Sequence, residues 1–250
     1  MAAQAFLGAG DVYIELLEAG VYSGKLGPFY ATKLELKPAV RKEEAKSKGR
    51  YTFGQPIETV LVPEPTAISM ELIQSDADGV SYALQAVKVA MSQASGSLTG
   101  ETFIAKKGFW VELTKNNFAA SAMTVTNTGA TVTYVEGVDY IMNRQLGWIK
   151  ILAGSAIIDL ASLKFTGAYL AKTGTLLRGS AKNQIRGRIW LDGVNLADSL
   201  PVTVFIYDAV LSSGSGFDFL SGKFESAKLD GSLNTLPGKT QPYTVEIFSA

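Results

Sequence analysis

Apolar and polar residues alternate along several segments of the chain, which is the pattern of β-strands with one buried face. Over residues 11–17, Val12, Ile14 and Leu16 fall on the same face. Residues 30–37 alternate in the same way. These segments predict a sheet with one dry face and one solvated face.

Charged residues of both signs replace this alternation in the segment 37–52, which we interpret as an extended charged loop. It fits a mobile surface loop, the tip of a long hairpin, or an arm that becomes ordered only against a neighbouring subunit. Strands are predicted after it at residues 59–62 and 68–73. Pro63 and Pro65 are expected to end the first of them, because proline cannot donate to a strand ladder.

Helical spacing is found once, over residues 79–93, where Val80, Leu84, Val87 and Met91 fall on one face. One helix beside many strands predicts a helix docked on the face or end of a sheet. Three polar residues are candidates for its N-cap: Ser75, Asp76 and Asp78.

The middle of the chain, residues 100–172, has a different rhythm of short apolar runs separated by turn residues. This spacing is typical of a small sandwich or barrel-like module. We expect it to be inserted into a discontinuous main domain formed by residues 1–99 and 173–250. Strands in the module are predicted at residues 109–114, 122–126, 130–135, 140–143, 148–152 and 163–169.

The last third of the chain returns to longer apolar alternation. A turn is expected at Asp192 and Gly193. The predicted fold class is therefore mainly β, an antiparallel sandwich or barrel with one helix and an inserted small β-module. Strands in this last third are predicted at residues 183–191, 201–207, 217–225, 227–233 and 242–248.

Composition narrows the chemistry. The 250 residues include no histidine and no cysteine, so the commonest general base, the commonest metal ligand and all thiol chemistry are absent from the chain. We therefore expect no catalytic residues, no metal site and no cofactor, and do not expect an enzyme.

Lysine and arginine balance aspartate and glutamate at 23 each, whereas proteins that hold DNA tightly by its phosphates carry a basic excess. The first twenty residues lack the features of a signal peptide, and no apolar run is long enough to span a membrane. The sequence predicts a protein of cytosolic origin that does not insert into membranes by itself.

The remaining candidate sites have structural interpretations. The glycines of residues 8–10 and 212–216 lack the context of nucleotide-binding loops and are expected to be flexible joints. Asp76 and Asp78 lack the rest of a calcium loop and fit a helix cap better. Asp192, Asp198 and Asp208 form no recognisable carboxylate pair. The three tryptophans fit core or interface anchors, although stacking on sugars or bases is a second interpretation: Trp110, Trp148 and Trp190.

The last third, read as a pattern, resembles the closing segment of bacteriophage major tail tube proteins, which are related to the inner tubes of type VI secretion systems. A short loop, an alternating strand, a phenylalanine-containing segment and a final strand follow one another in the same order. The start of the chain and the single helix are similar to that family, and the middle residues 108–151 resemble a β-module of some phage tail proteins. The matching residues of the last third are Gly193, Asn195, Leu196, Ala197, Asp198, Pro201, Val202, Val204, Ile206, Ala209, Leu211, Asp218, Phe219, Leu220, Ser221, Phe224, Leu229, Gly231, Pro242, Thr244 and Val245.

This resemblance implies a structural virion protein that assembles in the host cytoplasm. Homo-hexameric rings would stack into the tail tube, and DNA would pass through its channel transiently and without specific binding. The implied protein partners are the tape measure, the tail terminator and a distal tail or baseplate protein. The expected contacts between rings are Arg41, Lys42, Glu43, Glu44, Lys46, Lys48 and Arg50. The acids expected to line the channel are Glu15, Glu18, Glu35 and Glu71.

Two other functions are open from the sequence. The first is the inner tube of a contractile injector, either a tailocin or a secretion system. The second is a carbohydrate-binding or adhesin β-module, for which the three tryptophans and the small middle module argue.

Overall fold

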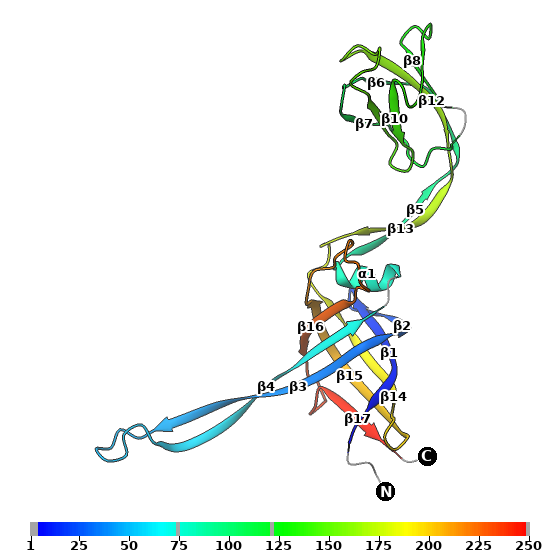
Figure 1. The fold of residues 1–250 in the computed structure, drawn as a ribbon. Coiled ribbons are helices and arrows are strands. Elements are labelled where there is room, and N and C mark those ends of the chain that lie inside the picture. Colours follow the sequence, from blue (N-terminus) through cyan, green and yellow to red (C-terminus); the bar gives the residue numbers. More distant parts are fainter. Residues whose placement is uncertain (1–4, 74–75, 121–122, 249–250) are drawn as a thin grey trace. The chain divides into compact units, whose positions relative to one another are not determined.

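The structure is a computed structural model, in which strands dominate and one helix occurs among the described residues (Figure 1). The predicted mainly β, antiparallel fold class with one helix is confirmed. The chain forms two compact units, one of Met1–Lys88 with Leu177–Ala250 and one of Val89–Leu176. The structure describes residues 5–73, 76–120 and 123–248.

The first unit is built around one eight-stranded antiparallel sheet with the order β2-β1-β14-β15-β16-β4-β3, in which β17 also pairs with β15. The predicted strands at the start of the chain lie in β1 and β3, and those of the last third, apart from residues 217–225, lie in β14 to β17. Its elements are β1 Gly8–Glu18, β2 Val21–Phe29, β3 Ala31–Lys46, β4 Pro56–Leu72, α1 Ala77–Ala83, β14 Ile185–Asn195, β15 Leu200–Ser213, β16 Ala227–Leu233 and β17 Tyr243–Ile247.

The core of this unit forms where the alternating apolar residues of these strands meet. Ile14 on β1 lies opposite Ile189 on β14, and Ile189 lies opposite Ile206 on β15, so their side chains share one face. Met70 on β4 and Tyr82 on α1 belong to the same buried cluster. The opposite face of the sheet carries charged residues such as Glu15 and Arg188, but also the aromatic residues Trp190 and Phe205, so it is only partly polar.

The predicted helix over residues 79–93 is wrong in length, since α1 ends at Ala83. Asp76 is the N-cap, and its carboxylate accepts a hydrogen bond from the Gly79 N–H at 2.8 Å. Gln85 adopts a left-handed conformation (φ 48°), which stops the helix. From Val87 onward the burial alternates with a period of two, so these residues form a strand instead. The N-cap candidate Ser75 lies outside the described residues.

The prolines that were expected to end a strand do not end it, because β4 runs continuously through both. Pro65 lies where the register between β3 and β4 shifts, and such a bulge leaves residues unpaired. Pro63 faces Val40 in a part of β4 that has no strand on its other side among the described residues, so a missing N–H is tolerated there. The two predicted strands are therefore parts of one long strand.

The turn expected at Asp192 and Gly193 is also wrong, because β14 continues through both residues. Gly193 lies between Gly10 on β1 and Val202 on β15. A Cβ atom at Gly10 would collide with the backbone of β14 at this point. The glycines therefore allow two strands to approach closely rather than reverse the chain.

The second unit is a small β-module with its own core. Ile149, Leu163 and Phe165 are completely buried in it. Each of the six predicted short strands corresponds to an observed strand, although Ala122 lies outside the described residues. The unit begins before residue 100 because β6 already pairs with β12 at Gly96. Its strands are β6 Gly96–Ile104, β7 Trp110–Glu112, β8 Thr124–Asn127, β9 Thr133–Tyr134, β10 Tyr140–Asn143, β11 Trp148–Ile151 and β12 Ser162–Tyr169.

The chain passes between the two units twice. One passage runs along β5 (Val87–Gln93) and the other along β13 (Lys172–Arg178), and these two strands pair with each other.

Candidate functional site

The β3–β4 hairpin carries most of the residues predicted for contacts between subunits. On the N-terminal side of Ala67, toward the hairpin tip, β4 no longer pairs with β16. There the hairpin continues as a two-stranded ribbon (Figure 1). Of the interpretations of residues 37–52, the structure supports the tip of a long hairpin, because β3 extends through this segment to Lys46. The predicted contact residues Arg41, Lys42, Glu43, Glu44 and Lys46 lie on β3, whereas Lys48 and Arg50 lie in the connection at the tip.

The charges of the ribbon are paired locally on the exposed strand β3. Arg41 lies 2.8 Å from Glu43 and 3.7 Å from Glu64 on the opposite strand. Lys42 pairs with Glu44, and the hydrogen bond from Lys42 lowers the pKa of that carboxyl. Exposed pairs of this kind contribute only about 0–1 kcal/mol each.

The opposite strand of the ribbon carries exposed apolar residues among its charged ones, and the sequence pattern did not mark them as functional. Ile57, Val60 and Leu61 are 72%, 51% and 61% exposed, and at the tip Tyr51 and Phe53 are 88% and 78% exposed. The signal that could have found this surface is the apolar run of residues 60–62 directly across from the charged residues 41–43 of β3.

An isolated two-stranded ribbon with exposed apolar residues is marginally stable in water. Both edges of this ribbon lack a strand partner in the described part of the chain, and unpaired edges are sites where another chain can add. The apolar area adds a hydrophobic driving force for covering the ribbon. The ribbon therefore has the properties of a docking arm.

A second exposed apolar surface lies in residues 217–225, where a strand was predicted. That prediction is wrong, because β15 and β16 already pair with each other at Ser213 and Leu229, and the segment between them has no strand to join. Phe224 is 99% exposed and Leu220 is 95% exposed.

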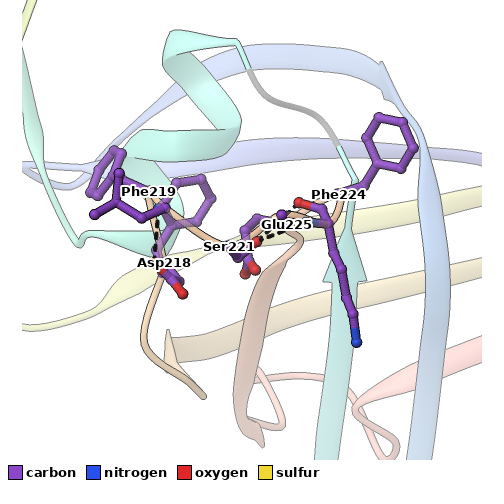
Figure 2. Close-up of a pocket in the computed structure, with 9 residues that line it drawn as sticks. Asp218, Phe219, Ser221, Phe224 and Glu225 are labelled. Carbon is purple, nitrogen blue, oxygen red and sulfur yellow. Dashed lines mark hydrogen bonds between the residues drawn. The ribbon is translucent and has the colours of Figure 1, made fainter.

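Short-range hydrogen bonds shape this loop around an open hollow lined by its own residues. The Leu220 N–H donates to Asp218 Oδ1 at 2.8 Å, and Ser221 Oγ donates to the Lys223 carbonyl at 3.0 Å. Figure 2 shows Phe219 and Phe224 on opposite sides of the loop. The loop thus presents large apolar side chains to solvent.

The four acids predicted for a channel lining fall into two groups on the sheet. Glu15 and Glu18 lie on β1, whereas Glu35 and Glu71 lie on the neighbouring strands β3 and β4. Strands β14, β15 and β16 separate β1 from β4, so the structure does not bring all four acids together within one subunit.

Each of these acids has a basic neighbour. Glu15 lies 3.5 Å from Arg188, Glu18 lies 2.6 Å from Lys182, and Glu35 lies 2.7 Å from Lys33. Glu71 lies opposite Lys33 and Lys228 in the strand register. The polar face of the sheet is therefore of mixed sign rather than acidic.

An ion pair between the partly exposed Arg186 and the buried Asp208, which the sequence did not reveal, fixes β14 to β15. Arg186 donates two hydrogen bonds, of 2.8 and 2.7 Å, to the carboxylate of Asp208, which is 1% exposed. Asn234 on the chain after β16 donates a third, of 2.9 Å. Burial acts to raise the pKa of Asp208, but the hydrogen bonds from Arg186 and Asn234 outweigh it, and the pKa lies below its ordinary value.

The loop between β14 and β15 is organised by Asn195, whose side chain is 6% exposed. Its Oδ1 accepts hydrogen bonds from the N–H groups of Leu7 and Ala197, at 2.9 and 3.3 Å. Asp198 Oδ1 accepts a bond of 3.1 Å from the Leu200 N–H. These side chains shape the loop and tie it to the start of the chain.

Within residues 5–73, 76–120 and 123–248, no group of acidic residues is arranged to hold a metal ion. In the same part of the chain, no helix reaches the length and apolar character needed to cross a membrane. Asp192 and Asp208 lie in strands and Asp198 lies in a loop, and the hydrogen bonds given above for Asp208 and Asp198 hold parts of the fold together.

Comparison with known proteins gives one family. The model of a family described as protein of unknown function UCP028589 matches residues 5–243. No curated protein matches the chain.

Proposed function

We propose a self-assembling structural role for this chain, which belongs to the family described as protein of unknown function UCP028589. In this proposal it is the tail tube subunit of a bacteriophage. Six copies form a ring, the rings stack, and DNA passes through the channel. The resemblance of the last third to tail tube proteins supports this function, and one structural observation carries it.

That observation is the β3–β4 ribbon. A lone subunit leaves the apolar side chains of Ile57, Val60 and Leu61 in water, on a ribbon that no third described strand joins. Docking on a neighbouring copy removes this apolar area from water at about 25 cal/mol per Å². We assign the ribbon to the contact between stacked rings.

Contacts within a ring require surfaces that differ on the two sides of a subunit, because a closed ring uses a heterologous interface. Strands β2 and β3 are the ends of the main sheet, and β17 pairs only with β15 among the described strands. Val245 and Ile247 on β17 are 48% and 63% exposed. We propose that pairing at such edges joins the sheets of neighbouring subunits.

The mixed charge of the sheet suits a channel through which DNA moves without being held. Lysine plus arginine equals aspartate plus glutamate at 23, and the acids proposed for the lining have basic neighbours. Such a surface provides no net attraction for a phosphate backbone.

Duplex DNA is therefore expected to bind the purified protein weakly or not at all at physiological salt. Fluorescence anisotropy of a labelled duplex oligonucleotide, measured at several salt concentrations, tests this expectation. Tight binding that weakens steeply with salt would contradict it, because that behaviour marks release of counterions from many phosphate contacts.

The assembly itself is tested by sedimentation velocity of the full chain over a series of protein concentrations. We expect the sedimentation coefficient to increase with concentration as rings and stacks form, since association follows mass action. A single monomer species at every concentration would count against the proposed function.

A further inference from the structure

The second unit contains a three-stranded sheet of the order β10-β11-β7, whose outer face is partly exposed. On its inner side Tyr140, Ile149 and Ile151 are buried in the core of the unit. The alternation of strand side chains places every second residue on the outer side. The outer residues are Trp110, Glu112, Ile141, Asn143, Trp148 and Lys150.

Two tryptophans, Trp110 and Trp148, lie on this face. Trp148 lies directly opposite Glu112, and Trp110 lies directly opposite Lys150, so the tryptophans occupy diagonal positions on adjacent strands. Diagonal neighbours are about 7–8 Å apart. This spacing lets each indole contact a different part of one extended ligand.

The side chains of both tryptophans are free of internal partners. Within the described part of the chain, neither Trp110 nor Trp148 makes a side-chain hydrogen bond, ion pair or ring contact. Trp190 of the first unit differs in this respect. It is stacked on Phe205 with ring centroids 4.8 Å apart, and the Lys25 ammonium lies 4.8 Å from its ring centre.

The polar residues of the face are available too. Glu112 and Lys150 lie beside the tryptophans and form no ion pair with a described residue. Together they provide one carboxylate acceptor and one ammonium donor, and their charges cancel. The face therefore combines two aromatic surfaces with hydrogen-bonding groups and has no net charge.

We propose that this face binds an uncharged glycan. The C–H faces of successive pyranose rings stack on Trp110 and Trp148. The sugar hydroxyls form hydrogen bonds with Glu112 and Lys150. The absence of net charge favours a neutral saccharide over a polyanion. A buried protein interface fits less well, because the cores of such interfaces are depleted in charged residues, whereas here a charged residue lies beside each tryptophan.

The test is a titration of the full-length protein with cellohexaose, laminarihexaose and chitohexaose, and with a hyaluronan hexasaccharide as the anionic comparison. We expect saturable quenching of tryptophan fluorescence by at least one neutral oligosaccharide. Trp110→Ala and Trp148→Ala are each expected to weaken that binding roughly twofold to tenfold, from about 0.5–1.5 kcal/mol per aromatic contact.

Phe109→Ala is the matched control, since Phe109 is 70% exposed in the same unit but precedes the strand that forms the face. The Phe109→Ala variant is expected to bind the oligosaccharide with the same affinity as the wild type. Titration calorimetry of Trp110→Phe, which keeps an aromatic surface, is expected to show binding between the wild type and the alanine variant.

Three results would overturn the proposal. One is the lack of binding to all three neutral oligosaccharides, and another is preferential binding of the anionic one. The third is loss of self-association, rather than of sugar binding, in the Trp110→Ala and Trp148→Ala variants, which would assign the face to a second copy of the chain. This inference does not depend on tube assembly, because sugar binding is measured on dilute protein.

Discussion

A variant in which Asn-Gly replaces residues 40–63 is expected to remain folded and to lose the ability to form stacked polymers. Ala39 and Glu64 are partners in the strand register, so a two-residue turn can join them. None of the removed residues belongs to the buried core of the first unit. Far-ultraviolet circular dichroism and thermal unfolding check the fold, and sedimentation velocity with electron microscopy checks the polymers.

Point variants distinguish the exposed apolar residues of β4 from the charged residues of β3 in the same ribbon. Val60→Thr combined with Leu61→Thr keeps strand propensity but removes exposed apolar surface, and is expected to weaken assembly strongly. Lys42→Gln combined with Glu44→Gln removes an exposed ion pair and is expected to change assembly little. Polymers of unchanged length and stability in the shortened variant would exclude the ribbon from assembly.

The largest effect on stability is expected for Arg186→Met. This change leaves the carboxylate of Asp208 buried, and among the described residues Asn234 is its one remaining side-chain donor. Asp208 is buried but Arg186 is 40% exposed, so the expected loss of unfolding free energy is that of hydrogen bonds to a charged group, about 1.5–3 kcal/mol. Urea unfolding at pH 7 measures the difference through the midpoint and slope of the transition.

The loss of unfolding free energy in Arg186→Met is expected to be larger at neutral pH than at acidic pH. In the wild type the folded state lowers the pKa of Asp208, so this group stabilises the fold above its ordinary pKa and the contribution is lost as the pH falls through the folded value. In Arg186→Met burial dominates and raises the folded pKa, so the protonated form is favoured. The difference in stability between the proteins is therefore expected to shrink over a pH range that starts above the ordinary aspartate pKa of about 4, where the variant binds a proton, and ends below it, where the wild type does.

Arg188→Met is the matched control, since Arg188 lies two residues further along the same strand. Its distance to Glu15 is 3.5 Å, and it also lies over the ring of Tyr22 at 3.8 Å. Glu15 is less buried than Asp208, and its 3.5 Å contact is longer than the hydrogen bonds of Arg186, so the expected cost is smaller, about 1 kcal/mol. Equal losses in both variants would show that burial of Asp208 is not what makes the first pair important.

The sequence predicted the strands well where one face is buried. The alternation in β1, β15 and β16 is clear because the core selects apolar residues at every second position. It misjudged the end of α1, because Val87 and Met91 fit helical spacing as well as strand alternation. The left-handed conformation that ends the helix is adopted by Gln85, whereas glycine or asparagine is the usual residue there, so the sequence does not signal this helix end.

Long-range contacts explain the other differences. Asp192 and Gly193 form a typical turn dipeptide, but close packing of β14 against β1 determines their role. The pair of Arg186 and Asp208 depends on the register between two strands, and the tryptophan face depends on the pairing of β7 with β11. A local pattern contains neither kind of information.

The most direct test of the proposed tube role is negative-stain electron microscopy of the full-length protein at high concentration, in parallel with the variant lacking residues 40–63. We predict six-fold rings and stacked tubes with a central channel for the wild type, and no stacked tubes for the variant. Wild-type particles that remain monomeric at every concentration and salt condition would contradict the proposed function.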